Sequence, residues 1–371
     1  MQYIQLAGTN AKGSTAQYLA EIIAQEYRCG LFTSPHMITP YERMRINGKM
    51  ISAEEYEYYM KNARGDGSKH LFCVWTEAAN AWFLDHNVEY AVLEAGLGGR
   101  LDPTNVYPSR MQILTPISYD HMELLGNTLE KIAWEKAGII KQGSVVLSHP
   151  QKEEAMQVIR KVCREKDAQL IVLKEEDIHI LRQDLNGQEF SFSYCKEKYT
   201  GLQIHAVSPM QIENACVALM AAVELGMAPA AIRQGLERME IPARVQIIGD
   251  VVIDGAHNPA AMEELESAIL RYYPDRDVTV LTAMMRDKDP ASVSKIVGRF
   301  ADQVLCTCVD PKRGLPAEKL ATFFDDACSV PEPEEAFAVA QRMKEQKKGI
   351  LVVCGSFYLA ADVLRLLAQS H

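Results

Sequence analysis

The stretch Tyr3–Ser14, YIQLAGTNAKGS, is a short apolar run that breaks into a glycine-flanked loop carrying a lysine and a hydroxyl group. A buried strand that feeds such a loop presents backbone N–H groups to phosphate, while Lys12 adds a positive charge and Ser14 can bind Mg²⁺. The stretch therefore predicts a nucleotide phosphate-binding loop. Its spacing differs from the common G-x-x-x-x-G-K-[ST], because Gly8 precedes Lys12 by four residues and Gly13 separates Lys12 from Ser14. On spacing alone, an ordinary strand–turn–helix is an equal alternative.

Length and composition limit the class of protein. The chain has 371 residues, of which 48% are hydrophobic and 24% charged, which is enough for two domains around a large core. It contains no apolar run of membrane-spanning length and no signal-peptide pattern, so we expect a cytoplasmic protein without a membrane span. The nine cysteines lack metal-ligand spacing and predict reduced thiols. A net charge of −10 argues against a general nucleic-acid surface.

The residues after the loop predict a helix over Thr15–Tyr27 and a second strand over Gly30–Ser34. A polar segment with His36 and Arg43 follows that strand. After a parallel strand, such a segment lies at the ligand edge of the sheet, although a solvated loop with incidental charges is an equal alternative.

A helical region is expected over Ser52–Asp85, followed by the motif EYAVLEAGLGGRLDPTN over Glu89–Asn105. Tyr90–Ala95 has the pattern of a buried strand, so Glu94 places a carboxylate at its carboxyl end. Burial of that charge is costly unless a cation compensates it. Glu94 is therefore a candidate metal ligand, and a structural salt bridge is the alternative.

A further strand over Met111–Ser118 delivers Asp120 and His121 to the same edge. The following helix, Thr128–Ala137, has apolar positions whose period places Lys136 on the buried stripe. A lysine at such a position more often extends to solvent. Gly138 is the expected helix stop.

Asn186–Gly187 predicts a hairpin turn, and Met210–Gly226 predicts a helix. Residues 240–244 break the helical pattern and predict the link between two domains, 1–241 and 242–371. The second domain alternates strands and helices, as a doubly wound α/β domain does.

At this point the sequence resembles the ATP-dependent Mur ligases, and among them the folylpolyglutamate and dihydrofolate synthases. The motifs that carry the resemblance occur in family order: GTNAKGS, LFTSPH, LEAGLGGRLDPTN, SYDH, WEKAGIIK, PAR, DGAHNP, DKD and GSFYLA. The resemblance implies an α/β fold with a P-loop-containing Mur-ligase-type central domain and a smaller Rossmann-like C-terminal domain. It also implies ligation of L-glutamate to a folate or dihydropteroate carboxylate through an acyl phosphate, with ATP and Mg²⁺. We expect these small-molecule substrates, no nucleic acid or membrane partner, and a monomer.

The expected site residues follow from the matched motifs. For the nucleotide they are Gly8, Thr9, Asn10, Lys12, Gly13, Ser14, Asn214, Arg244 and Asp254. For the metal they are Ser14, Ser34, Glu94, His121 and Lys136, the last as a carbamate. The expected catalytic residues are Lys136, His121, Glu94 and His257, and the expected substrate-binding residues are His36, Arg43, His257 and Ser356.

Three departures from the family pattern define the alternatives. Ala11 replaces a loop glycine, Ser208 stands near the place of another glycine, and the family's usual helical segment does not precede Tyr3. The last departure favours, as an alternative, a ligase of the same chemistry that acts on a non-folate acid. Ala11 favours a second alternative, a nucleotide-binding paralogue that no longer catalyses.

Overall fold

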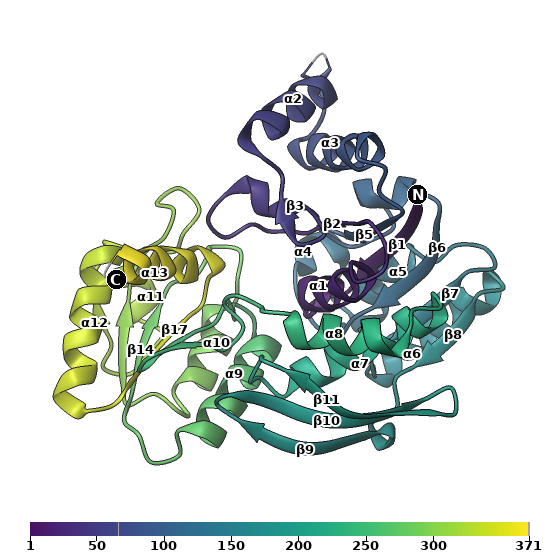
Figure 1. Cartoon of the computed structure of the whole chain (residues 1–371). Coiled ribbons are helices and arrows are strands. Elements are labelled where there is room, and N and C mark those ends of the chain that lie inside the picture. The colour runs from purple at the N-terminus through teal and green to yellow at the C-terminus, as the bar shows by residue number, and fades with distance from the viewer. Residues whose placement is uncertain (66, 370–371) are drawn as a thin grey trace. The chain divides into compact units, whose positions relative to one another are not determined.

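The computed structural model describes residues 1–65 and 67–369 and divides the chain into two compact units. The first consists of Met1–Arg182, Gln188–His205 and Gln211–Met239. The second consists of Gln183–Gly187, Ala206–Met210 and Glu240–His371. Figure 1 labels their elements. The expected domain boundary after residue 241 stays a prediction.

The first unit is built on an eight-stranded sheet in the order β4-β3-β2-β5-β1-β6-β7-β8. β1 lies inside this sheet between two parallel neighbours, with Leu6 paired to Glu94 of β5 and to Ile113 of β6. β1 can occupy that position because its last four residues are apolar or neutral and all buried. The strands are β1 (Gln2–Ala7), β2 (Cys29–Phe32), β3 (Met44–Ile46), β4 (Lys49–Met50), β5 (Tyr90–Glu94), β6 (Ser109–Leu114), β7 (Val145–Ser148) and β8 (Gln169–Val172).

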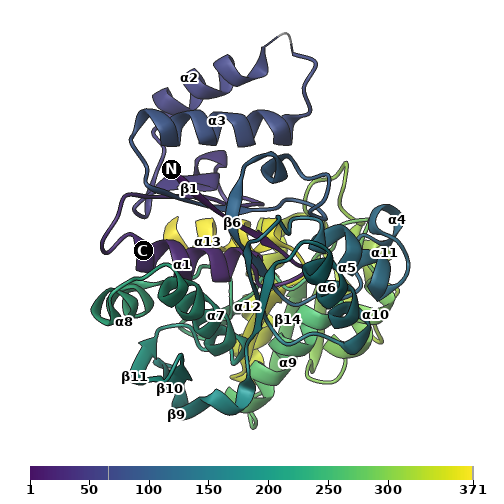
Figure 2. The ribbon, with the colours of Figure 1, turned by 90° about the vertical axis from the view of Figure 1, so that its right-hand side faces the viewer.

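Helices cover this sheet and follow its strands. α2 and α3 lie side by side in both Figure 1 and Figure 2. None of the helices among the described residues is long and apolar enough to span a bilayer. The helices of this part are α1 (Lys12–Ile23), α2 (Ala53–Arg64), α3 (Leu71–Asp85), α4 (Met122–Leu125), α5 (Leu129–Ala137), α6 (Glu153–Glu165), α7 (Met210–Glu224) and α8 (Pro229–Arg238), with 3₁₀ turns η1 (Pro40–Arg43), η2 (Pro103–Val106) and η3 (Glu175–Asp177).

Several expected boundaries were wrong for identifiable reasons. The helical region 52–85 is two helices, because Gly65 and Gly67 adopt positive φ (57° and 84°) and interrupt it; residue 66 lies outside the described residues. The strand expected over 111–118 ends at Leu114, just before Pro116, which has no N–H to continue the ladder. The helix expected over 15–27 spans Lys12–Ile23 instead.

A small antiparallel sheet in the order β11-β10-β9 follows η3. It comprises β9 (Ile178–Asp184), β10 (Gly187–Tyr194) and β11 (Glu197–Ile204). The expected hairpin joins β9 and β10, but its turn residues are Leu185 and Asn186, and Gly187 already begins β10. The next turn places Cys195 and Lys196 at positive φ (50° and 67°), as a two-residue hairpin requires.

The second unit contains a six-stranded sheet in the order β12-β13-β17-β14-β15-β16, with only β12 antiparallel to its neighbour. Its alternation of strands and helices confirms the expected doubly wound pattern. Its elements are β12 (Gln246–Ile248), β13 (Val251–Ile253), α9 (Pro259–Tyr272), β14 (Val278–Thr282), α10 (Pro290–Val297), β15 (Gln303–Cys306), α11 (Ala317–Ala321), β16 (Cys328–Ser329), α12 (Pro333–Lys347), β17 (Ile350–Cys354) and α13 (Phe357–Gln369).

The crossing of α1 and α8 gives a test of this fold. A Cβ added at Gly235 would lie 2.4 Å from Ile22 Cα, so the two helix backbones meet where only glycine fits. We expect Gly235→Ala to lower the free energy of unfolding by about 1–3 kcal/mol, because one of the backbones must shift. Urea denaturation followed by circular dichroism measures this. Gln234→Ala, at the exposed neighbouring position, is the control and should be nearly neutral.

Candidate active site

The glycine loop after β1 is held to the segment that follows β6. Thr9 N and Asn10 N both donate to Pro116 O, at 2.9 and 3.3 Å. Gly8 lies so close to this segment that an added Cβ would lie 1.9 Å from Thr115 Oγ1. The loop therefore needs a residue without a side chain at Gly8.

Ala11 adopts the left-handed conformation, with φ 65° and ψ −5°, immediately before α1. It is the N-cap residue of α1 and has no side-chain group that could cap the helix. A non-glycine residue in this region costs on the order of 1 kcal/mol. The departure from the family glycine thus falls at a position whose backbone favours glycine.

Two lysine side chains converge on one carbonyl oxygen of this loop. Lys12 Nζ donates to Gly8 O at 3.0 Å and to Thr9 O at 3.1 Å. Lys136 Nζ, from α5, donates to the same Gly8 O at 2.7 Å. Two lysine amino groups therefore meet at one point of the glycine loop, where positive charge would favour the binding of phosphate.

Lys136 is buried, with 4% of its surface exposed, so the alternative in which it extends to solvent is wrong. Burial and the neighbouring Lys12 lower the pKa of Lys136 to about 7, although Asp120 and Asp102 act in the opposite sense. A large share of these side chains is therefore neutral amine near pH 7, and a neutral amine can act as a nucleophile.

Glu94 lies beside the loop at the end of β5 and is 3% exposed. Its Oε2 accepts a hydrogen bond from Ser34 N at 2.8 Å and lies 3.4 Å from the position of a Cβ built on Gly13. Ser14, the next residue of α1, is also buried. The tertiary structure thus brings together a carboxylate and the residues that carry two hydroxyl groups, at the edge where the glycine loop begins α1.

This set of residues fits Mg²⁺ bound together with a nucleotide. Mg²⁺ is usually held by one or two carboxylates plus phosphate oxygens and water, and seldom by a cage of protein ligands alone. Residues 1–65 and 67–369 contain no group of three or more His, Cys, Asp or Glu side chains that could hold a metal ion. A single buried carboxylate next to hydroxyl groups and a phosphate loop is the arrangement expected.

His121 begins α4 in the left-handed conformation, with φ 49°. Its Nε2 lies 3.8 Å from Asp120 Oδ2, and its side chain is 36% exposed. Because Asp120 acts electrostatically on Lys136, the Asp120–His121 turn belongs to the neighbourhood of the buried lysine.

The segment between β2 and β3 is ordered around Arg43 and is not a solvated loop. Arg43 is 7% exposed, its Nε donates to His36 Nδ1 at 2.8 Å, and its Cζ lies 4.0 Å from the centroid of the Trp75 ring. Burial and Arg43 lower the pKa of His36, against a smaller opposing effect of Glu42. The expected substrate-binding residues His36 and Arg43 therefore contact each other directly.

The expected site residues of the second unit lie at the carboxyl ends of β13 and β17. Asp254 Oδ2 accepts from Val245 N and its Oδ1 from Ala256 N, each at 2.7 Å. Arg244 Cζ lies 4.7 Å from the centroid of the Phe357 ring. Burial raises the pKa of Asp254, while Arg244 and the two backbone N–H groups lower it.

His257 and Ser356 complete this group. The His257 ring lies 5.7 Å from Phe357, and its Nδ1 lies 2.8 Å from Gly255 O. Ser356 is buried, and its Oγ accepts from Tyr358 N at 3.1 Å at the start of α13. Phe357, between Arg244 and His257, was missed because an aromatic residue at a helix start has no distinguishing local pattern.

Asn214 is only 1% exposed, and its amide is held by His149, which follows β7, and by Gln211 of its own helix α7. His149 Nε2 lies 3.0 Å from its Oδ1, and its Nδ2 donates to Gln211 Oε1 at 3.1 Å. Burial lowers the pKa of His149 to about 4. His149 was missed because a single histidine after a strand carries no motif.

A second missed network holds the backbone around Lys136. Asn105 Nδ2 donates to Arg100 O and to Gly138 O at 3.0 and 3.1 Å, and Lys141 Nζ donates to Asn105 Oδ1 at 2.6 Å. Gly138 follows the last residue of α5 as expected, but its φ of −62° is right-handed. Glycine is required there because an added Cβ would lie 2.3 Å from Arg100 Cβ.

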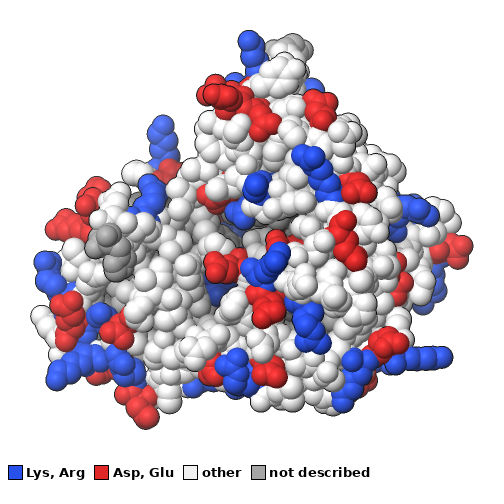
Figure 3. Space-filling view, in the orientation of Figure 1, with Lys and Arg blue, Asp and Glu red and all other residues white. Residues whose placement is uncertain are grey.

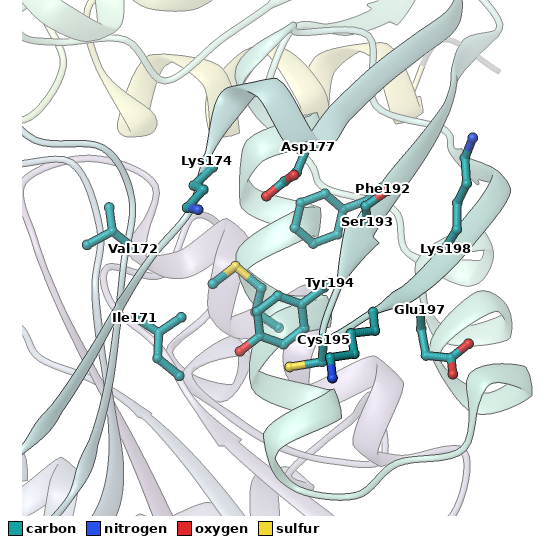
Figure 4. Close-up of a pocket in the computed structure, with 12 residues that line it drawn as sticks. Ile171, Val172, Lys174, Asp177, Phe192, Ser193, Tyr194, Cys195, Glu197 and Lys198 are labelled. Atoms are coloured by element: carbon teal, nitrogen blue, oxygen red, sulfur yellow. The ribbon is translucent and has the colours of Figure 1, made fainter.

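Other surface features lie outside these groups. A hollow of about 410 Å³ is lined by Phe192, Tyr194 and Met220 among others, and none of the expected site residues lines it. Figure 4 shows Phe192 and Tyr194 at this hollow. On the face seen in Figure 3, basic and acidic side chains are interspersed. That face therefore lacks the broad basic surface that a nucleic-acid partner favours.

Comparison with known families gives two matches in chain order. Residues 6–222 match the Mur ligase middle domain, and residues 237–357 match the Mur ligase glutamate ligase domain. The first match alone covers more than half of the chain.

The similar proteins and structures carry consistent names. A dihydrofolate synthase/folylpolyglutamate synthase of Bacillus subtilis is 30% identical over 98% of this chain and 89% of its own length. The Mycobacterium tuberculosis folylpolyglutamate synthase, solved with ADP and AMPPCP, has a TM-score of 0.91 and 28% identity, covering 98% of this chain and 90% of that one. The Escherichia coli enzyme, solved with DHPP and ADP, has a TM-score of 0.89 and 29% identity, covering 100% and 89%.

The conformation of Ala11 leads to a prediction about the loop. Glycine at positive φ avoids a cost of about 1 kcal/mol, so the loop conformation seen here should be more populated in Ala11→Gly. We expect the dissociation constant for ATP to fall about two- to fivefold, as measured by isothermal titration calorimetry. Ala24→Gly, at a helix end with ordinary φ, is the control. Unchanged or weaker binding in Ala11→Gly would show that neighbouring contacts accommodate the alanine.

Proposed function

This chain belongs to the Mur ligase family, and we propose that it is an ATP-dependent ligase that joins L-glutamate to a folate-type carboxylate through an acyl phosphate. The observation that carries the proposal is the convergence of Lys12 and Lys136 on Gly8 O, next to the buried carboxylate of Glu94. Cations and a metal-binding carboxylate beside a glycine loop suit the transfer of a phosphoryl group.

The relatives support both the cofactors and the substrates. The Yersinia pestis enzyme was solved with AMPPNP and Mn, another bifunctional synthase with Mn, AMPPNP and L-glutamate, and the Escherichia coli enzyme with DHPP and ADP. ATP with Mg²⁺ is the corresponding physiological pair. We assign this chain glutamate and a folate or dihydropteroate acid as substrates on that basis.

The first unit supplies the nucleotide and metal residues. The backbone of Gly8, Thr9, Asn10 and Gly13, with Lys12 and Asn214, holds the nucleotide. Ser14, Ser34 and Glu94 would hold one Mg²⁺, and His121 with the carbamate of Lys136 would hold a second. The bound metal would neutralise charge on the phosphate oxygens.

The low pKa of Lys136 supports its expected carbamate. A neutral amine attacks CO₂ and loses a proton, which converts a cation into an anion suited to a metal. The same change would remove the repulsion between the ammonium groups of Lys12 and Lys136, which meet at Gly8 O.

The remaining roles are assigned by motif position. His36 and Arg43 bind the acceptor acid, His257 and Ser356 bind glutamate, and Arg244 and Asp254 contact the nucleotide. His257 is also the fourth catalytic residue of the proposal, beside Lys136, His121 and Glu94. The proposal also includes that the protein is a monomer and that it acts in the cytoplasm.

One experiment distinguishes the proposal from its two alternatives, a ligase for a non-folate acid and a non-catalytic nucleotide-binding paralogue. The purified protein is given ATP and Mg²⁺ with dihydropteroate, tetrahydrofolate or a panel of other carboxylic acids, with and without L-glutamate, and ADP release is measured. Release that needs both a folate-type acid and glutamate supports the proposal. Release with another acid alone favours the non-folate ligase, and no release with any acid favours the non-catalytic paralogue.

Replacement of Lys136 separates catalysis from nucleotide binding. We expect Lys136→Ala to lower kcat at least about 100-fold while the affinity for ATP changes little, because the loop and Lys12 remain. Added short carboxylic acids should restore part of the activity by supplying the missing anion. Lys131→Ala, at an exposed position of the same helix, is the control. Full activity in Lys136→Ala would contradict the assigned role.

A further inference from the structure

Arg43, His36 and Trp75 form one connected group from two separate parts of the first unit. Arg43 and His36 lie between β2 and β3, whereas Trp75 lies in α3, which contacts β2. The Arg43 guanidinium lies over the Trp75 ring at 4.0 Å, and the His36 ring meets the same tryptophan edge-on, with centroids 6.1 Å apart.

Trp75 is itself held in place. Its Nε1 donates to Tyr56 OH at 2.6 Å, and Tyr56 packs against Tyr41 with ring centroids 5.0 Å apart. The indole is therefore a fixed surface on which the guanidinium rests, and such cation–π contacts are strongest where water is excluded.

The backbone next to His36 is also fixed. The Glu42 carboxylate accepts from Met37 N, Ile38 N and Thr39 N at 2.9, 2.8 and 2.7 Å. Two residues before His36, Ser34 N donates to Glu94. His36 thus stands on an ordered segment at the same edge of the sheet as the candidate active site.

The hydrogen bond between Arg43 and His36 decides where the imidazole proton lies. Arg43 Nε can only donate, so His36 Nδ1 must accept, and the ring hydrogen is on Nε2. His36 is partly exposed, and Nε2–H is the ring donor that the contact with Arg43 does not use. A donor of this kind suits a substrate oxygen, such as the carbonyl or carboxylate of an acid.

We propose that Arg43 and Trp75 are positioning residues that hold His36 as a hydrogen-bond donor, through Nε2–H, to an oxygen of the acceptor acid. Arg43 then contributes to acceptor binding through His36, in place of the direct contact that its motif position alone assigned to it. The inference rests on the proposed ligase function, and it adds Trp75, which no motif identified, to the residues that determine acceptor binding.

Two substitutions of His36 test the roles of its two ring nitrogens separately. His36→Asn keeps an acceptor near the position of Nδ1 and loses the donor, whereas His36→Gln places an amide donor near the position of Nε2. We expect His36→Asn to raise the KM for the acceptor acid about tenfold, with kcat and the KM values for ATP and glutamate within about twofold. His36→Gln should stay within about threefold of the wild type.

Arg43 offers a second matched pair. The Nε2 of glutamine occupies the same place along the side chain as Arg43 Nε, so Arg43→Gln can still donate to His36, whereas Arg43→Met cannot. Arg43→Met should therefore resemble His36→Asn, and the double variant should be no worse than either single one. Trp75→Leu should also raise the acceptor KM, and Trp75→Phe, which keeps an aromatic face, should do so less.

The measurement is steady-state ADP release by the full chain with dihydropteroate or tetrahydrofolate, after thermal melting has shown that each variant is folded. An unchanged acceptor KM in His36→Asn, or additive effects in the double variant, would overturn this inference alone. Equal increases of the KM for ATP, glutamate and the acceptor would also overturn it, by indicating general disruption. A wild type that releases no ADP with any folate-type acid would overturn both this inference and the proposed function.

Discussion

The meeting of two lysine amino groups at Gly8 O is the constraint on which the active-site half of this protein depends. Lys12 and Lys136 both donate to that oxygen, although they are far apart in the chain. When both amino groups are protonated, their positive charges repel each other, and the repulsion is stronger where solvent is excluded. An anion bound between them, or the loss of one proton, relieves this repulsion. A bound phosphate would supply the anion, and the lowered pKa of Lys136 favours loss of its proton.

The surrounding structure serves to keep those groups in place. β1 delivers the loop, Pro116 and Thr115 after β6 hold it, and α5 directs Lys136 toward it. Close backbone approaches at Gly8 and Gly138 explain why glycine occurs at these positions although neither has positive φ. At these two positions glycine is needed because neighbouring atoms leave no room for a side chain, and not because the backbone adopts positive φ.

Several buried polar side chains at this sheet edge have partners within the structure, as burial favours. Arg43 binds His36 and stacks on Trp75, Asn214 binds His149, and Asp102 accepts from the backbone of Gly96 and Leu97. These contacts fix the orientation of side chains that would otherwise rotate. Pre-organised donors and acceptors are the means by which a ligase distinguishes one substrate oxygen from another.

The sequence alone determined the glycine loop, the buried stripe that includes Lys136, and the two alternating α/β segments, because motif spacing and periodicity are local properties. It missed the break of the helical region after Arg64, where two glycines outweighed the helical pattern on either side. Only the tertiary structure decided that Lys136 lies buried on Gly8 O and that Trp75 supports Arg43. These contacts join residues 128 positions apart in one case and different secondary-structure elements in the other, so no local pattern encodes them.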